Sequence, residues 1–378
     1  MAKLIDILLL LYFGLFPFGQ LTKIPLGIPE INLYLTDIIV GILGGLGILG
    51  IMRGKRPRPP LFKPMSLFLL IAGFSLAVNI SRFQPREIII SSLYLVRLIA
   101  YFGFYLTAYR FRKKIIFKNC LIVAGLAAAI FGLIQYFMMP NMTPLTIFEW
   151  DPHYYRLVGT FLDPGFTGII LVLTLILLIT SQLNAIGYWL LAIGYLSLAL
   201  TYSRASYLAF LASMTVLSLR RKSLRLLGTI IIIMVITIII LPRKSGGEGI
   251  RLERTTSVQA RIGNWQQAWS IFRKYPLIGV GFNTYRYAQK NAGLLDEKWQ
   301  VSHSGAGADS SLLFVLATTG MLGVFGMLGL LGKIWQISRG KSTVVLASMS
   351  AVLVHSFFLN SLFYPWVLGW LMVILAED

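Results

Sequence analysis

Two residues late in the chain could act as a general base on a hydroxyl group. His303 and Asp309 flank a stretch of small residues, 304–308, directly before an apolar run. A neutral imidazole can accept a proton near neutral pH, and a carboxylate can do so itself or orient the imidazole. The structural alternatives are a loop histidine and an N-capping aspartate for a helix that starts near Ser310.

Arginines beside or inside apolar runs are the second kind of candidate. Arg204 begins the run 204–219, and Arg97 lies inside the run 88–109. A charge at membrane depth is costly unless it is paired, so such a residue indicates function by default. Arginine can bind a phosphate through two parallel hydrogen bonds, which lysine cannot reproduce. Arg97 has no acidic residue close in sequence, and a structural role for it stays open.

A long hydrophilic segment, residues 242–307, carries ten basic and four acidic residues, and Arg261 and Arg286 are among the basic ones. A net positive loop is what an anionic substrate such as a lipid-linked diphosphate would need. The alternative is a solvated loop that touches lipid head groups. We expect Arg261 and Arg286 to bind the diphosphate.

Residues 257–275 within this segment predict an amphipathic helix. Ile262, Trp265 and Trp269 recur at helical spacing, and Ser257 could cap the N-terminus. Such a helix would lie along the membrane surface. Arg261 and Trp265 share a face that we expect to point toward the protein, although a snorkelling surface arginine is the alternative.

The rest of the sequence must position these residues within a membrane. Of its 378 residues 57% are hydrophobic and 13% are charged, whereas a soluble domain has about a quarter charged. Recurring apolar runs predict an all-α, polytopic helical bundle of about 12 transmembrane helices, because lipid cannot satisfy unpaired backbone groups. We expect one domain, 1–378, with spans near 4–20, 31–52, 65–80, 88–109, 115–138, 166–181, 185–201, 204–219, 226–241, 308–332, 343–360 and 361–376.

The distribution of Lys and Arg sets the orientation. Basic residues concentrate in the short loops 53–63, 110–118, 220–225 and 333–341, which fall on one side of the predicted bundle. By the positive-inside rule this side and the N-terminus are cytoplasmic. The smaller loop 139–165, and the larger loop 242–307 between the ninth and tenth spans, are then outside. The net charge of +20 therefore reflects orientation, and no nucleic acid partner is predicted.

Metal and nucleotide chemistry find no support in the sequence. Cys120 is the only cysteine, and the three histidines form no metal-ligand pattern, so no metal or other cofactor is expected. Glycines at every third position from Gly320 to Gly332 predict a closely packed helix surface.

Four motifs together resemble the bacterial O-antigen ligase and polymerase superfamily. They are Arg204 within Ser203-Arg204-Ala205; Arg261 and Trp265 running into Tyr275-Pro276 and the glycine turn at Gly279 and Gly281; Arg156 with Gly159 and Asp163-Pro164, preceded by Gln135; and Asp309-Ser310 ahead of Gly320 and Gly323. Their order matches the family over the whole chain.

The resemblance implies a metal-independent, inverting glycosyltransferase outside the bacterial cytoplasmic membrane. Its donor would be a glycan on undecaprenyl diphosphate, and its acceptor a saccharide or glycolipid hydroxyl. Arg204 and Arg261, with Arg156, would bind the diphosphate, while Gln135, Asp163, Arg97 and Trp265 are possible substrate ligands. The family's histidine position holds Asp309 here, so the base is either Asp309 or His303.

Two other functions use the same residues. A transporter or flippase of lipid-linked saccharides would place the basic residues in a central cavity and show internal repeats. A non-catalytic assembly partner would tolerate the unusual Asp309. Because the basic residues are predicted to cluster at the outer face, the glycosyltransferase is favoured over the transporter.

Overall fold

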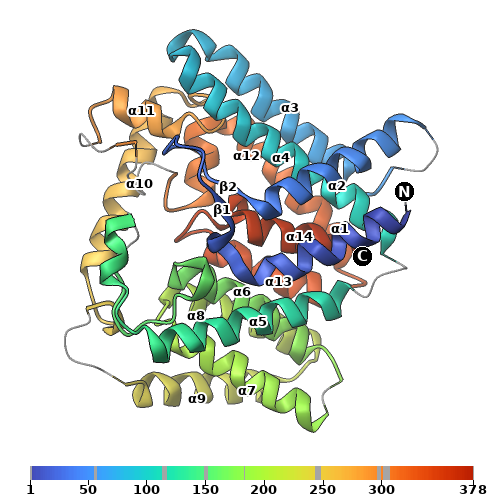
Figure 1. Ribbon diagram of the computed structural model, residues 1–378, viewed down its shortest axis with the longest axis vertical. Coiled ribbons are helices and arrows are strands. Elements are labelled where there is room, and N and C mark those ends of the chain that lie inside the picture. Colours follow the sequence, from blue (N-terminus) through green and yellow to red (C-terminus); the bar gives the residue numbers. More distant parts are fainter. Residues whose placement is uncertain are drawn as a thin grey trace.

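The computed structural model describes residues 2–54, 58–112, 117–148, 152–182, 184–242, 248–295, 299–300 and 307–377. Helices dominate this part of the chain (Figure 1). The α-helices are α1 (Ala2–Leu15), α2 (Leu35–Met52), α3 (Phe62–Val78), α4 (Pro85–Phe111), α5 (Phe117–Met138), α6 (Pro164–Ile179), α7 (Ala185–Leu200), α8 (Arg204–Arg220), α9 (Leu224–Ile240), α10 (Thr256–Lys274), α11 (Tyr285–Asn291), α12 (Ser311–Ser338), α13 (Thr343–His355) and α14 (Pro365–Glu377).

Short 3-10 helices connect many of these elements. They are η1 (Phe16–Thr22), η2 (Ile80–Arg82), η3 (Thr143–Phe148), η4 (Gly159–Phe161), η5 (Glu248–Ile250) and η7 (Ser361–Phe363). The expected predominantly α-helical fold is confirmed, and the strands β1 (Lys23–Ile24) and β2 (Leu33–Tyr34) form a short antiparallel pair between α1 and α2.

Five segments among the described residues are long and apolar enough to cross a membrane: Lys3–Thr22, Leu35–Met52, Pro85–Phe111, Phe117–Met138 and Ser311–Ser338. Six further apolar helices have 10–17 residues. Each coincides with a predicted span to within several residues, and together they confirm a polytopic helical bundle. The number of twelve crossings stays a prediction.

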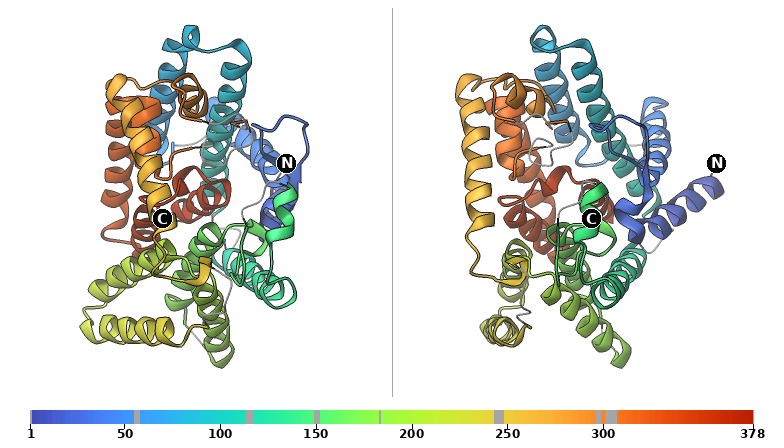
Figure 2. Two further views of the ribbon diagram at one scale, coloured as in Figure 1. Left: turned by 90° about the vertical axis from the view of Figure 1, so that its left-hand side faces the viewer. Right: turned by 60° about the vertical axis from the view of Figure 1, so that its left-hand side comes forward.

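The bundle has two opposite ends. At one end the backbone N–H of Lys118 donates to Glu377, and Arg220 donates to the carbonyl oxygen of Arg339. At the other end α10 runs across the bundle, along the left of Figure 1, and both chain ends lie away from it. The left view of Figure 2, in which this side faces the viewer, shows α10 in front. We call this end, with α10 and loops 152–163 and 248–255, the α10 end.

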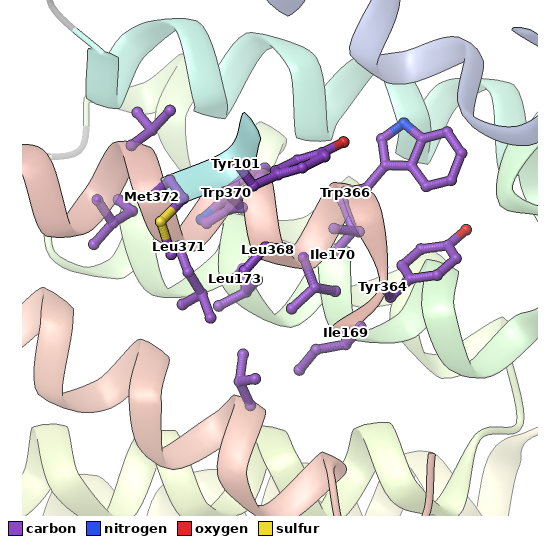
Figure 3. Packing of buried hydrophobic residues seen from close by; sticks show 14 of the residues in the cluster. Tyr101, Ile169, Ile170, Leu173, Tyr364, Trp366, Leu368, Trp370, Leu371 and Met372 are labelled. Carbon is purple, nitrogen blue, oxygen red and sulfur yellow. The ribbon is translucent and has the colours of Figure 1, made fainter. Parts of the chain in front are cut away.

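The centre of the bundle is α14, whose residues Pro365–Ala376 are all buried. Figure 3 shows Trp366 and Trp370 of α14 close to Tyr101 of α4 and to Ile169 and Ile170 of α6. Aromatic side chains of this size bury a large apolar area each. A buried central helix gives the shorter helices around it a common surface to pack on.

The helix α12 is broken at Gly320, where φ is 63° and ψ is −161°. A turn that follows α10 fills the break, because Met321 N–H donates to Pro276 O at 2.8 Å and Val280 N–H donates to Ala317 O at 3.0 Å. A Cβ atom on Gly320 would lie 2.4 Å from Leu277 O. Gly320 thereby fixes the end of α10 against α12. The predicted close packing is confirmed at Gly320, Gly323 and Gly326. It is wrong at Gly329 and Gly332, where no atom of the described structure lies within 4 Å of the Cβ position.

A substitution at this break should destabilise the fold. Gly320→Ala must place a side chain in a backbone region used essentially by glycine, at about 1–3 kcal/mol, and must displace the turn as well. Gly329→Ala is the matched control on the same helix, since no atom lies within 4 Å of its Cβ position. We expect the thermal unfolding midpoint in detergent to fall for Gly320→Ala and to stay or rise for Gly329→Ala. Equal unfolding midpoints for the two variants would contradict a stabilising role for the packing of the turn against α12.

Candidate functional site

Arg156 stands in the loop between α5 and α6, and Gln135 holds that loop in place. The Gln135 side-chain oxygen accepts hydrogen bonds from Val158 N at 2.9 Å and Gly159 N at 3.2 Å. Its amide nitrogen donates to the carbonyl oxygens of Met139 and Arg156. With these bonds Gln135 holds the loop that carries Arg156, and contact of Gln135 with substrate stays a prediction.

The Arg156 guanidinium group is buried and bound to backbone oxygens. Its Nε donates to Thr201 O at 3.0 Å and its Nη2 to Tyr202 O at 3.3 Å. Burial, followed by the charges of Arg254 and Arg261, lowers the pKa of Arg156 to about 9, which leaves the group protonated at neutral pH. Tyr202 has a left-handed backbone with φ of 49°, an uncommon conformation for so bulky a residue.

Arg204 begins α8, directly after the N-cap Ser203. Its Nη1 donates to Leu252 O at 3.1 Å and Arg254 O at 3.0 Å, and its Nη2 donates to Ser257 Oγ at 2.6 Å. Ser257 was expected to cap α10, but the helix begins at Thr256 and Ser257 binds Arg204. Arg204 therefore ties the start of α8 to the start of α10.

Arg254 belongs to the same cluster, although the sequence did not distinguish it from the other basic residues of its loop. Its Nη1 donates to Gly249 O at 2.6 Å and Arg251 O at 2.8 Å, and its Nη2 reaches Tyr202 O at 3.5 Å. Burial and then the charge of Arg204 lower the pKa of Arg254 to about 10. The carbonyl of Tyr202 thus accepts from two guanidinium groups.

Arg261 differs from the other three arginines. It is half-buried on α10, as expected, and makes no hydrogen bond or ion pair with another residue in the described part of the chain. Burial lowers the pKa of Arg261. The charge of Asp309 raises this pKa, and the charge of Arg204 lowers it further. No residue of the described part of the chain therefore occupies the five donors of this guanidinium group, which suit an anion. We call Arg156, Arg204, Arg254 and Arg261 the arginine cluster.

Asp309 lies next to Arg261 at the start of α12, and α10 holds its backbone on both sides. Asn264 Oδ1 accepts from Asp309 N at 2.7 Å, and Trp265 Nε1 donates to Asp309 O at 3.0 Å. Burial and then the charge of Asp309 raise the pKa of Tyr285. Trp265 is therefore a positioning residue, and Asn264 is another, which the sequence did not single out.

Asp163 and His153 complete the surroundings of the cluster. Asp163 caps α6, with Oδ1 accepting from Phe166 N at 2.7 Å, and its charge acts on both Arg156 and Arg261. Nε2 of His153 is buried and has no hydrogen-bond partner in the described structure. Burial and the charge of Arg156 lower the pKa of His153 to about 4, so the imidazole is neutral at pH 7.

Two predicted site residues lie outside this cluster. Arg97 forms an ion pair with Asp37 Oδ2 at 2.9 Å and stands over the ring of Tyr94, 4.9 Å from its centre. Arg286 donates to Gln300 O, and burial lowers its pKa while the charges of Tyr94, Tyr287 and Glu30 oppose this shift. Their roles in binding a diphosphate or a saccharide stay predictions. His303 lies outside the described residues.

No group of three or more His, Cys, Asp or Glu side chains in the described ranges could hold a metal ion. The carboxylates whose charges act on the arginine cluster are those of Asp163 and Asp309. This arrangement can bind an anion and can hold a carboxylate next to it. The expectation of catalysis without a metal stays a prediction.

Residues 169–328 match a family model described as O-antigen ligase. No curated protein matches the chain. The matched residues include Arg204, Arg254, Arg261 and Asp309, and the match confirms the resemblance to the O-antigen ligase and polymerase superfamily. This family and the apolar helices together indicate a multi-pass bacterial inner-membrane protein with glycosyltransferase function in polysaccharide biosynthesis.

The buried neutral His153 should make stability depend on pH. Its folded pKa of about 4 lies below the ordinary value of 6.5, so the unfolded chain binds the proton more readily. This contribution to stability is complete above about pH 6.5 and is lost as the pH falls toward 4. Replacing His153 by Gln should flatten the dependence of the thermal unfolding midpoint on pH in this window. A wild-type slope unchanged in the variant would contradict the assignment.

Proposed function

We propose that the protein transfers a glycan from undecaprenyl diphosphate to a saccharide hydroxyl at the outer face of the membrane. The observation that carries this proposal is the arginine cluster, in which Arg156, Arg204 and Arg254 are bound by neutral oxygens and Arg261 has no hydrogen-bond partner among the described residues. Because carbonyl oxygens do not cancel the positive charge, the cluster suits a diphosphate. The basic residues of the opposite end favour a cytoplasmic location for that end and an outer location for the site.

The reaction would be a single displacement at the anomeric carbon of the donor. Asp309 accepts the proton of the acceptor hydroxyl, whose oxygen forms the new bond to that carbon. The bond from the carbon to the diphosphate breaks on the opposite side, so the configuration inverts. Negative charge grows on the departing diphosphate, and the arginine cluster stabilises it in the transition state.

A transport function is the alternative, and the placement of the charges argues against it. The arginine cluster lies at one end of the bundle, where α8 and α10 both begin. A carrier with alternating access needs its site near the middle of the membrane. The ion pair of Arg97 with Asp37 neutralises a charge inside a predicted span.

Transfer can be tested with purified protein, a lipid-diphosphate glycan and candidate acceptors, with a chelator present. A polymerase would lengthen the lipid-linked chains, and a ligase would attach the glycan to a different acceptor. Absence of any transfer, combined with movement of labelled lipid across vesicles, would contradict the enzyme and support the transporter.

Arg261 can be tested with a matched control on the same helix. Arg261→Lys keeps the charge but loses the paired donors, so we expect kcat to fall by about 10²–10³-fold. Arg273→Lys changes an exposed arginine of α10 and should leave kcat as in the wild type. Wild-type activity in Arg261→Lys would remove Arg261 from the diphosphate site.

The base can be assigned by comparing two variants. We expect Asp309→Asn to lower kcat by about 10²–10⁴-fold, since the amide cannot accept the proton, while His303→Ala changes it little. The pH profile should lose its acidic limb in Asp309→Asn. The opposite ranking of the two variants would assign the base to His303.

A further inference from the structure

A second group of charged side chains lies at α11. Arg86 forms an ion pair with Glu30 at 3.1 Å, and Lys290 forms one with Glu87 at 3.4 Å. Tyr287 of α11 lies close to both pairs, since burial raises its pKa and the charges of Glu30 and Glu87 raise it further. In Figure 1, α11 lies at the upper left, beside the connection between β1 and β2 that carries Glu30.

Trp299 adds an aromatic ring to this group. The ring centres of Trp299 and Tyr287 are 6.0 Å apart, at an interplanar angle of 75°. Lys290 Nζ lies 4.4 Å from the centre of the Trp299 ring. Trp299 and Lys290 are both partly exposed, so a ligand can reach them from outside. We call this surface the α11 patch, and it consists of Glu30, Arg86, Glu87, Tyr287, Lys290 and Trp299.

The charges of the α11 patch are mostly compensated, in contrast to those of the arginine cluster. Arg86 and Lys290 are each paired with a carboxylate, and Arg286 of the same helix lies close to Glu30. The oxygens of a diphosphate accept hydrogen bonds and are repelled by a carboxylate. A sugar hydroxyl both donates and accepts, so it can bind a carboxylate and a neighbouring cation at once. The α11 patch therefore suits saccharide hydroxyls better than a diphosphate.

Glu30 carries an acceptor atom that favours a hydroxyl in particular. Its side chain is only 2% exposed, and its Oε1 has no hydrogen-bond partner in the part of the chain that the structure describes. A buried acceptor is costly unless a donor reaches it. A hydroxyl can supply that donor, whereas a diphosphate oxygen cannot. Arg86, which is paired with the other carboxylate oxygen, is 56% exposed and can turn outward to admit the hydroxyl.

One short helix joins the α11 patch to the surroundings of Asp309. Burial and then the charge of Asp309 act on Tyr285, the first residue of α11, and Tyr287 follows two residues later. Gln289 of the same helix donates to the side chain of Gln267 on α10 at 2.8 Å. A ligand on the α11 patch therefore lies along the helix that begins near the proposed base.

From the compensated charges, the aromatic ring and the carboxylate of Glu30, we propose that the α11 patch binds a saccharide. Trp299 packs against the C–H groups of a sugar ring, and the carboxylates and cations bind its hydroxyls. This proposal rests on the proposed function, because the saccharide is one of the two that the transfer joins. It is either the glycan of the donor or the acceptor, and the two sources can be distinguished by experiment.

Equilibrium binding tests the α11 patch without any transfer reaction. Two free oligosaccharides are titrated into the intact protein in detergent: the glycan released by mild acid from the donor of the transfer assay, and the oligosaccharide acceptor of that assay. We expect Trp299→Ala to raise the Kd of at least one of them about tenfold. Trp335→Ala removes the same ring from a side chain of α12 that is 59% exposed, and should leave both Kd values unchanged. Unchanged Kd values in Trp299→Ala, or no binding of either saccharide to the wild type, would overturn the proposal.

Inorganic pyrophosphate separates the α11 patch from the arginine cluster. Glu30→Gln should weaken saccharide binding about tenfold, because a charged acceptor binds a hydroxyl more strongly than an amide does. The Kd of pyrophosphate should stay as in the wild type, and Arg261→Lys should show the reverse pattern. Weaker pyrophosphate binding with unchanged saccharide binding in Glu30→Gln would overturn the proposal. Thermal unfolding reports on folding, and Trp299→Ala serves in the same comparison if Glu30→Gln does not fold.

Steady-state kinetics identify the source of the saccharide. If the α11 patch binds the acceptor, Trp299→Ala raises KM for the acceptor and leaves KM for the donor unchanged, and the reverse result assigns the patch to the donor glycan. If a free saccharide binds the patch but no glycan is transferred, the saccharide site stands and the proposed function fails. If transfer occurs and Trp299→Ala changes neither KM nor Kd, the function stands and the saccharide site fails.

Discussion

The α10 end depends on hydrogen bonds from arginine guanidinium groups to uncharged carbonyl and hydroxyl oxygens. Burying a guanidinium group costs free energy unless its donors are paired. Arg156, Arg204 and Arg254 meet this requirement with backbone carbonyls and one hydroxyl. A carboxylate would pair the donors equally well but would cancel the charge. Carbonyl oxygens keep the charge for an incoming anion.

This solution constrains the local backbone. The carbonyl of Tyr202 can serve both Arg156 and Arg254 because Tyr202 takes a left-handed conformation before the N-cap of α8. Gln135 fixes the loop that carries Arg156, and Arg204 fixes the loop before α10. The helices themselves are ordinary apolar segments. It is the turns between them that are shaped by the charge.

The position of Asp309 beside the arginine cluster is fixed by a different set of contacts. The turn that fills the break of α12 at Gly320 fixes the end of α10, and Asn264 and Trp265 then hold the backbone of Asp309. The base that we propose at Asp309 needs such a rigid connection to the arginine cluster, because small displacements at a reacting centre lower the rate strongly. The same turn shows why its glycines cannot be replaced by larger residues.

The sequence predicted the elements better than their contacts. The periodicity of residues 257–275 predicted α10 and the inward face of Arg261, because a helix fixes which residues share a face. Asn264 carries no local signal, since its partner Asp309 is distant in the sequence, and nothing in the sequence separates Arg254 from the other basic residues of its loop. The partner of Arg97, Asp37, is likewise distant in sequence. Gly320 continues the three-residue glycine spacing of a helix packing surface. The break of α12 at this position depends on the inserted turn, which the sequence does not reveal.

The most direct test of the central claim is the affinity for glycan-free isoprenoid phosphates. Equilibrium binding of undecaprenyl diphosphate and undecaprenyl monophosphate is compared for the wild type and for Arg261→Gln at one salt concentration. If the retained charge of the cluster recognises a diphosphate, the wild type binds the diphosphate at least about tenfold more tightly, about 1.4 kcal/mol, and the variant loses most of this difference. Equal affinities for the two lipids in the wild type would contradict the account.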